Sequence, residues 1–229
     1  MPPASQPLLP DSPLPPSRRE RRSADIRERL FRSALRLFAQ KGFAETTVED
    51  ITEAADVGKG TFFNYFPSKD HVLLAFSDMQ LAKLEESVHD LEQSQQSLPD
   101  FMRSFVLRMS EEPLRNPGMI RAILLGYLSS SEVREAMIGK QIRAHGLHTR
   151  IVEIGQARGE IRTDLPATEI AHAFRQTILG TLLLWSVVGD ASLRDRIDSA
   201  LHLLFNGIGT KHDPTLSKVK TTPETSEPQ

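Results

Sequence analysis

The stretch 46–69 constrains this 229-residue chain more than any other, because its residues predict two short helices joined by a tight turn. Thr46 and Glu49 stand three positions apart, which is the spacing of a capping box. In such a box a hydroxyl and a carboxylate satisfy free N–H groups at a helix start. A first helix is therefore expected over about 47–55. The second helix must end before Pro67, because the residue before a proline disfavours helical backbone.

The second helix, expected to begin near Lys59, has one side for the protein core and one side for a partner. Phe62 and Phe66 lie one turn apart and can anchor the helix in the core. The adjoining outward arc is the part that a DNA major groove would meet. A lysine there can donate to guanine O6 and N7, a glycine allows close backbone approach, and a phenylalanine can contact a thymine methyl group. The base-reading candidates are Lys59, Gly60, Phe63 and Asn64.

Spacing, capping and aromatic positions together resemble the DNA-binding signature of the tetracycline-repressor-like (TetR) transcriptional regulators over about 23–76. The matching residues are Thr47, Val48, Ile51, Val57, Gly60, Thr61, Phe62, Phe63, Tyr65, Phe66 and Lys69. Thr52 stands where that family usually has alanine, and its hydroxyl can bond back to the helix. The resemblance implies phosphate contacts at four positions, and Asn64 could serve bases or phosphates. These four are Thr47, Thr61, Tyr65 and Lys69.

The chain begins with a segment that cannot hold regular structure. Seven prolines fall within residues 1–17, so 1–22 is expected to be a disordered arm. Four cations follow the prolines and stand directly before an amphipathic helix expected over 23–41. We expect these cations to neutralise phosphates or to enter the minor groove; the alternative is a solvated helix start. They are Arg18, Arg19, Arg21 and Arg22.

Charge is uneven along the chain, and cysteine is absent. Residues 17–69 carry 11 Lys and Arg against 8 Asp and Glu, whereas the whole chain carries 28 against 30. The absence of cysteine excludes disulfides and thiol nucleophiles and fits a reducing cytoplasm. The longest apolar run, 178–188, is too short to span a bilayer, and no secretory signal is visible. The sequence therefore predicts a cytoplasmic protein without a membrane partner.

The pattern beyond Pro67 is helical throughout, with turn chemistry at each break. Helices are expected over 68–93, 99–112, 117–128, 131–158, 167–188 and 193–205. No alternating strand pattern is present, so the predicted fold class is all-α. We expect a helix-turn-helix DNA-binding domain at 23–67, a helical effector-binding and dimerisation domain at 68–209, and a disordered tail at 210–229.

The last two expected helices are apolar nearly all round, so they must be covered on every side. In TetR-like proteins the corresponding helices form a four-helix dimer interface, and a twofold dimer suits a palindromic DNA site. The alternative is that they form the core of a monomer. The expected interface residues are Ile178, Leu182, Trp185, Leu201, Leu204 and Phe205.

Large, adaptable side chains could line an effector pocket in the helical domain. The candidates are Phe76, Met79, Phe105, Met109, Tyr127, Met137 and Phe174. His145 and His148 share a helix face, but no nearby carboxylate or cysteine completes a metal site, so no metal is expected. No nucleophile, base and orienting group can be assembled either, so neither catalysis nor a cofactor is expected.

Together these features favour a homodimeric, sequence-specific transcriptional regulator. The resemblance implies a repressor that leaves a palindromic DNA operator when a small apolar or amphipathic effector binds the helical domain. For this to work, the effector must bind the DNA-incompetent state more tightly. Two alternatives remain at this point: an architectural DNA-binding protein without an effector, and a helical enzyme that keeps the DNA-binding domain as a relic.

Overall fold

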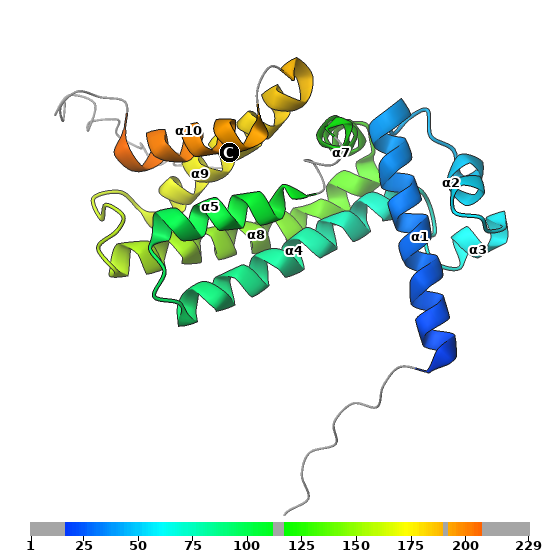
Figure 1. Ribbon diagram of the computed structural model, residues 1–229, viewed down its shortest axis with the longest axis horizontal. Helices are drawn as coiled ribbons and strands as arrows, with labels where there is room; N and C mark the ends of the chain where they lie inside the picture. Colours follow the sequence, from blue (N-terminus) through cyan, green and yellow to red (C-terminus); the bar gives the residue numbers. More distant parts are fainter. Residues whose placement is uncertain (1–16, 112–116, 190–191, 208–229) are drawn as a thin grey trace, which may run out of the picture. The chain divides into compact units, whose positions relative to one another are not determined.

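The computed structural model describes residues 17–111, 117–189 and 192–207 (Figure 1). Every regular element within these ranges is an α-helix, which confirms the predicted fold class. The expected disordered segments 1–16 and 210–229 lie outside the described residues. The helices are α1 (Arg18–Lys41), α2 (Val48–Ala54), α3 (Lys59–Phe63), α4 (Asp70–Gln93), α5 (Leu98–Met109), α7 (Gly118–Ser129), α8 (Ser131–Ala157), α9 (Ala167–Val188) and α10 (Leu193–Asn206).

Helix α1 begins at Arg18, five residues earlier than expected, and this corrects the predicted arm over 18–22. The reason is a capping box that the arginines obscured in the sequence. The Ser17 N–H donates to Glu20 Oε2 at 2.7 Å, and the Glu20 N–H donates to Ser17 Oγ at 3.2 Å. These bonds lower the pKa of Glu20, first through the backbone of Ser17. The acidic residue also offsets the cations at the positive end of the helix dipole.

The described residues form two compact units. The head unit contains residues 17–83 and 117–144, and the body unit contains 84–111, 145–189 and 192–207. Helices α4 and α8 each contribute residues to both units. The domains expected from the sequence follow the chain in order, whereas each unit is assembled from separate segments.

In the head unit, α1 packs against α2 and α7, and α2 packs against α3. Gly118 marks where α7 comes closest to α1, because a Cβ there would lie 2.1 Å from the carbonyl oxygen of Ala39. The most deeply buried side chains come from α1, α2, α4, α7 and the segment around α3, so one apolar core unites the unit. They include Leu30, Ala34, Phe38, Ile51, Phe62, Phe66, Val72 and Met119.

In the body unit, α10 packs against α5 and α9. Arg103 on α5 reaches Asp198 on α10 with two hydrogen bonds of 2.7 and 2.8 Å. The core of this unit includes Leu91, Leu98, Ile151, Leu193 and Ile197. None of the described helices combines the length and the apolar content needed to cross a bilayer.

Candidate DNA-binding site

The end of α1 prepares the entry to the helix-turn-helix. Gly42 follows α1 with a φ of +90°, a conformation that favours glycine, and its N–H donates to the carbonyl of Phe38 at 3.0 Å. Phe43 then turns back into the core, where its ring lies 5.0 Å from that of Phe38. The end of α1 at Lys41 agrees with the helix expected over 23–41.

The capping box at the start of α2 lies one residue later than predicted. Thr47, and not Thr46, is the N-cap: its Oγ1 accepts the Asp50 N–H at 3.1 Å, and its N–H donates to Asp50 Oδ2 at 2.8 Å. Thr46 is fully buried and donates its hydroxyl to the carbonyl of Gly42 at 2.7 Å. The sequence contains two overlapping capping patterns, and the burial of Thr46 decides between them.

Lys41 completes this capping box from α1. Its Nζ lies 2.7 Å from Asp50 Oδ2. This bond, followed by those from Thr47, lowers the pKa of Asp50 to about 2. The start of α2 is therefore tied to the last turn of α1 by an ion pair and to its own first turn by the cap.

A tight turn separates α2 from α3. Asp56 adopts a φ of +53°, which Asp tolerates better than most side chains. Gly58 then precedes α3, and the helix begins at Lys59 as predicted. Within α2, Thr52 donates its hydroxyl to the carbonyl of Glu49 at 3.0 Å, which confirms the expected bond back to the helix.

Helix α3 has the two sides that the sequence predicts. Phe62 and Phe66 are buried in the head-unit core, with ring centroids 5.7 Å apart. Phe63 is 48% exposed although it lies next to Phe62 in the chain. The other three base-reading candidates, Lys59, Gly60 and Asn64, are also exposed. All four candidates are therefore exposed to solvent on α3 or at its C-cap, and a Cβ placed on Gly60 would meet no atom within 4 Å outside its own stretch of helix.

The phosphate candidates differ in how free their donors are. The Thr47 hydroxyl accepts one bond at the cap, so its own proton remains available. Thr61 is half-buried at the first turn of α3. The Tyr65 hydroxyl lies 3.0 Å from Ser23 Oγ on α1, a partner that the sequence pattern does not indicate. Both of these groups can donate and accept, so the pair leaves a proton for an outside acceptor.

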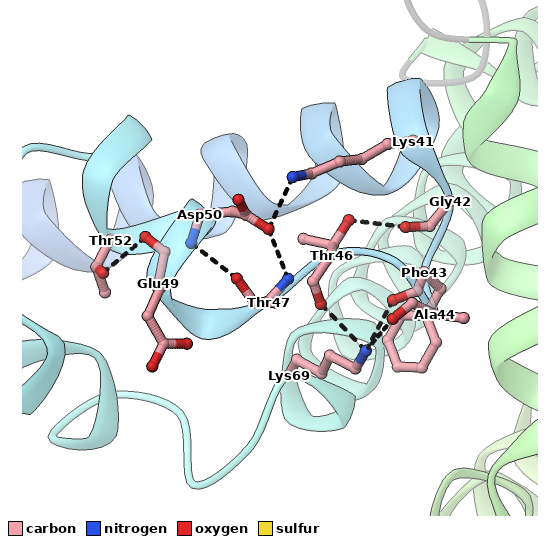
Figure 2. A network of polar contacts seen from close by, with 10 residues as sticks. All are labelled: Lys41, Gly42, Phe43, Ala44, Thr46, Thr47, Glu49, Asp50, Thr52 and Lys69. Carbon is pink, nitrogen blue, oxygen red and sulfur yellow. Dashed lines mark hydrogen bonds and ion pairs between the residues drawn. The ribbon is translucent and has the colours of Figure 1, made fainter.

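Lys69 occupies a different environment from the other phosphate candidates. Its Nζ donates to the carbonyls of Phe43, Ala44 and Thr46 at 2.9, 3.0 and 3.1 Å (Figure 2). The ammonium also lies 4.6 Å from the centre of the Phe43 ring. Three bonds use every proton of the ammonium. Lys69 thus binds protein carbonyls in this structure, where the sequence suggested a DNA phosphate.

The basic residues at the start of α1 form an exposed group. Arg18, Arg19, Arg21 and Arg22 are all exposed within the first helical turns, where an ordered backbone presents them. Further along α1, the guanidinium of Arg27 lies 5.4 Å from the centre of the Phe66 ring. The tertiary contacts of Arg27, Tyr65 and Lys69 have no local sequence signal, because each joins residues distant in the chain.

The candidates for the effector pocket fall into both units. Phe76 belongs to the buried core of the head unit, and Met79 packs against that core, with Tyr127 and Met137 half-buried in the same unit. Phe105, Met109 and Phe174 belong to the body unit. Within the described residues, no group of three or more His, Cys, Asp or Glu side chains could hold a metal.

The dimer candidates lie on α9 and α10 of the body unit. Trp185 and Leu204 line an open groove between these helices. Ile178 and Leu182 are half-buried on α9, and the Phe205 ring packs 5.4 Å from that of Phe174. Leu201 is buried in the body unit and exposes little of its side chain.

The proteins to which this chain is similar include transcriptional regulators. Residues 30–76 match the family model described as bacterial regulatory proteins, tetR family. The transcriptional regulator AcuR of Cereibacter sphaeroides is 30% identical over 154 residues, which cover 63% of this chain and 69% of AcuR. The transcriptional repressor AcnR of Corynebacterium glutamicum is 29% identical over 158 residues, covering 67% of this chain and 77% of AcnR.

Similarity to a solved structure extends over both units. The TetR-family transcriptional repressor FadR of Thermus thermophilus, solved in complex with lauroyl-CoA, is 28% identical with a TM-score of 0.59. The matched region covers 82% of this chain and 97% of FadR. Taken with the capped helix-turn-helix and the exposed face of α3, these similarities show that the chain belongs to the tetR family of bacterial transcriptional regulators.

Proposed function

We propose that this protein is a cytoplasmic homodimeric repressor that binds a palindromic operator and releases it when an amphipathic acyl thioester binds the body unit. The observation that carries the DNA-binding part is the exposed face of α3. Its four candidate residues stand in solvent while Phe62 and Phe66 hold the helix in the core. Such a helix can enter a major groove without unfolding its support.

An exposed apolar face supports the dimer. The groove between α9 and α10 has a volume of about 750 Å³ and is lined mainly by apolar side chains, including Leu184, Trp185, Val188, Leu203 and Leu204. Leu184 is 65% exposed, and its neighbours Val187 and Val188 are also largely exposed. A contiguous apolar surface of this kind marks a protein interface, and a second copy of the chain would cover it.

A small cavity in the body unit supports the effector site. It has a volume of about 10 Å³ and is lined by eight side chains, among them Met102, His148 and the predicted pocket residue Phe174. The ring of Phe105 lies 6.0 Å from that of His148. The cavity holds no more than a water, so an acyl chain must push its walls apart. An effector that binds the opened form more tightly shifts the equilibrium away from the closed form.

The relative FadR, with its bound lauroyl-CoA, is the reason for proposing an acyl thioester. An apolar chain suits the Met102 and Phe174 walls. The proposed effector is therefore amphipathic, and its apolar part is what opens the cavity.

One selection experiment tests the DNA-binding part directly. The purified full-length protein is used to enrich bound sequences from a random duplex pool, and a palindrome with two half-sites is expected. Lauroyl-CoA, with free CoA as its matched control, is then added to the complex. Release by lauroyl-CoA but not by free CoA supports the proposed effector class. Enrichment of no common sequence contradicts the proposed function, and release by both compounds contradicts the role of the acyl chain.

A further inference from the structure

Lys69 lies between three elements of the head unit. It precedes α4 by one residue, and its ammonium reaches back to the turn that leads from α1 into α2 (Figure 2). The three acceptors are backbone carbonyls, namely those of Phe43, Ala44 and Thr46. Backbone acceptors cannot move away by changing a rotamer. The three bonds therefore fix the turn relative to the start of α4.

We propose that Lys69 is a positioning residue that holds the N-terminus of α2 in place for DNA without itself contacting a phosphate. We call the three bonds from its ammonium to residues 43, 44 and 46 the Lys69 clasp. This inference rests on the DNA-binding function proposed above. It replaces the direct phosphate contact that the resemblance implied for Lys69.

The clasp acts next to the residues that begin α2. Its third acceptor is the carbonyl of Thr46, which is bonded to the N-cap residue Thr47. On the other side, Lys41 binds Asp50 at 2.7 Å, and the Thr46 hydroxyl binds Gly42. The first turn of α2 is thus tied to α1 and to the start of α4. The Thr47 hydroxyl, one of the phosphate candidates, is held in one orientation by these bonds.

A direct phosphate contact would require Lys69 to give up this arrangement. The ammonium has three protons, and the clasp uses all of them. Two of the three bonds are partly buried, and the Phe43 ring covers the ammonium at 4.6 Å. Moving Nζ to DNA would leave three carbonyls without this partner and would remove the cation from the ring. The clasp therefore competes with phosphate binding.

Helix α4 gives the clasp a second consequence. It continues from Asp70 to Gln93 and contributes residues to both units. A displacement of its first turn would be passed to the turn before α2 through Lys69. The Lys69 clasp therefore links the start of α4 to the DNA-binding surface.

Lysine footprinting of the wild-type protein tests the clasp without any variant. The full-length protein is treated with an amine-acetylating reagent, with and without the selected operator, and the reactivity of each lysine is measured by mass spectrometry. Lys69 is expected to react slowly in both samples. Lys59, whose side chain is 57% exposed although it pairs with Glu49, is the internal comparison: it should react faster than Lys69 in the free protein and become protected on DNA. A Lys69 that reacts readily in the free protein and becomes protected on DNA overturns the inference.

The salt dependence of Lys69→Met provides the second test. Loss of a direct phosphate contact makes the slope of log K against log salt shallower by about 0.9 for each contact. Loss of a positioning residue weakens operator binding at every salt concentration and leaves the slope unchanged. We expect about a tenfold weaker affinity, in line with the loss of charge-assisted bonds, and the wild-type slope. A shallower slope, or a folded variant with wild-type affinity, overturns the inference.

The two tests separate this inference from the proposed function. If the wild-type protein shows no preference for any DNA sequence, the proposed function fails. The reactivity of Lys69 in the free protein then still decides the clasp, since slow acetylation supports it and fast acetylation overturns it. If Lys69→Met does not fold, the reactivity of Lys69 in the wild-type protein decides the clasp in the same way.

Discussion

Glu49 on α2 and Lys59 at the start of α3 form an ion pair across the turn of the helix-turn-helix, with side chains that remain 62% and 57% exposed. The pair holds a carboxylate beside the lysine expected to read DNA bases. The same pair lowers the pKa of Glu49, chiefly through the hydrogen bond from Lys59. Because the pair is exposed, its contribution to stability is small, and its main effect concerns what the lysine can bind.

Glu49→Gln should reduce discrimination between DNA sequences. Without the carboxylate, Lys59 is free to bind any nearby phosphate, and repulsion of the DNA backbone falls. We expect binding to random duplex DNA to strengthen about two- to fivefold, with a smaller change on the operator. Equilibrium titration of both DNAs measures the ratio. Glu53→Gln is the matched control, since it removes the same charge from α2. Equal effects of the two variants would show that only net charge matters.

Gly60→Ala should raise the stability of the protein and weaken its binding to DNA. Nothing lies within 4 Å of a Cβ at this position, and alanine favours a helix more than glycine does. We expect the free energy of unfolding to rise by up to about 1 kcal/mol. Operator affinity should fall at the same time, because the added methyl group would stand between α3 and the DNA. Gly139→Ala in α8 also meets nothing within 4 Å and should leave operator binding unchanged. Wild-type operator affinity for Gly60→Ala would refute close backbone approach at this residue.

The lowered pKa of Asp50 predicts that the folded protein loses stability in acid. Its pKa is about 2 in the folded protein, mainly because of Lys41, and about 4 in an unfolded chain. A lowered folded pKa stabilises the protein above the unfolded value, and this stabilisation disappears as pH falls from about 4 through about 2. The difference in Tm between wild type and Asp50→Asn should therefore shrink over that range in thermal melts. Lys41→Met should raise the pKa of Asp50 in a carboxyl NMR titration. An unchanged pKa in that variant would contradict the role of Lys41.

Leu184→Glu should weaken the proposed dimer. The substitution places a carboxylate on the apolar groove of α9 and α10, and twofold symmetry would bury it twice. We expect the dimer dissociation constant to rise at least about 30-fold, as for an interface hot spot. Sedimentation equilibrium measures it. Ile142→Glu changes a similarly exposed apolar residue on α8 and is the control. A Leu184→Glu protein that stays dimeric would show that this face is not the interface.

Much of the fold could be predicted because its helix ends are set by local chemistry. The bounds of α9, Ala167–Val188, agree with the prediction, since Pro166 precedes the helix and Gly189 follows it with a φ of +66°. The burial of Phe62 and Phe66 was equally accessible from their four-residue spacing; α3 ends at Phe63, but the Phe66 N–H still donates to the carbonyl of Phe62 at 2.9 Å.

The parts that could not be predicted depend on competition or on distant contacts. Thr46 and Thr47 both begin a capping pattern, and only the burial of Thr46 settles the register. The start of α1 could not be predicted because the prolines and the four arginines favoured a disordered basic arm over a helix capped by Ser17. The Lys69 clasp joins residues 23 to 26 positions apart, and no periodic pattern records such a contact.

The core of the head unit includes Met119 and Ala122 from α7, which follow α3 by more than fifty residues in the chain. A ribosome that has produced only the helix-turn-helix and the start of α4 has therefore not yet supplied the side chains that close this core. The nascent DNA-binding region must wait for α7 to emerge before its apolar residues are covered. Synthesis of the chain thus delays a fully folded DNA-binding surface until the body unit's first segment has already been translated.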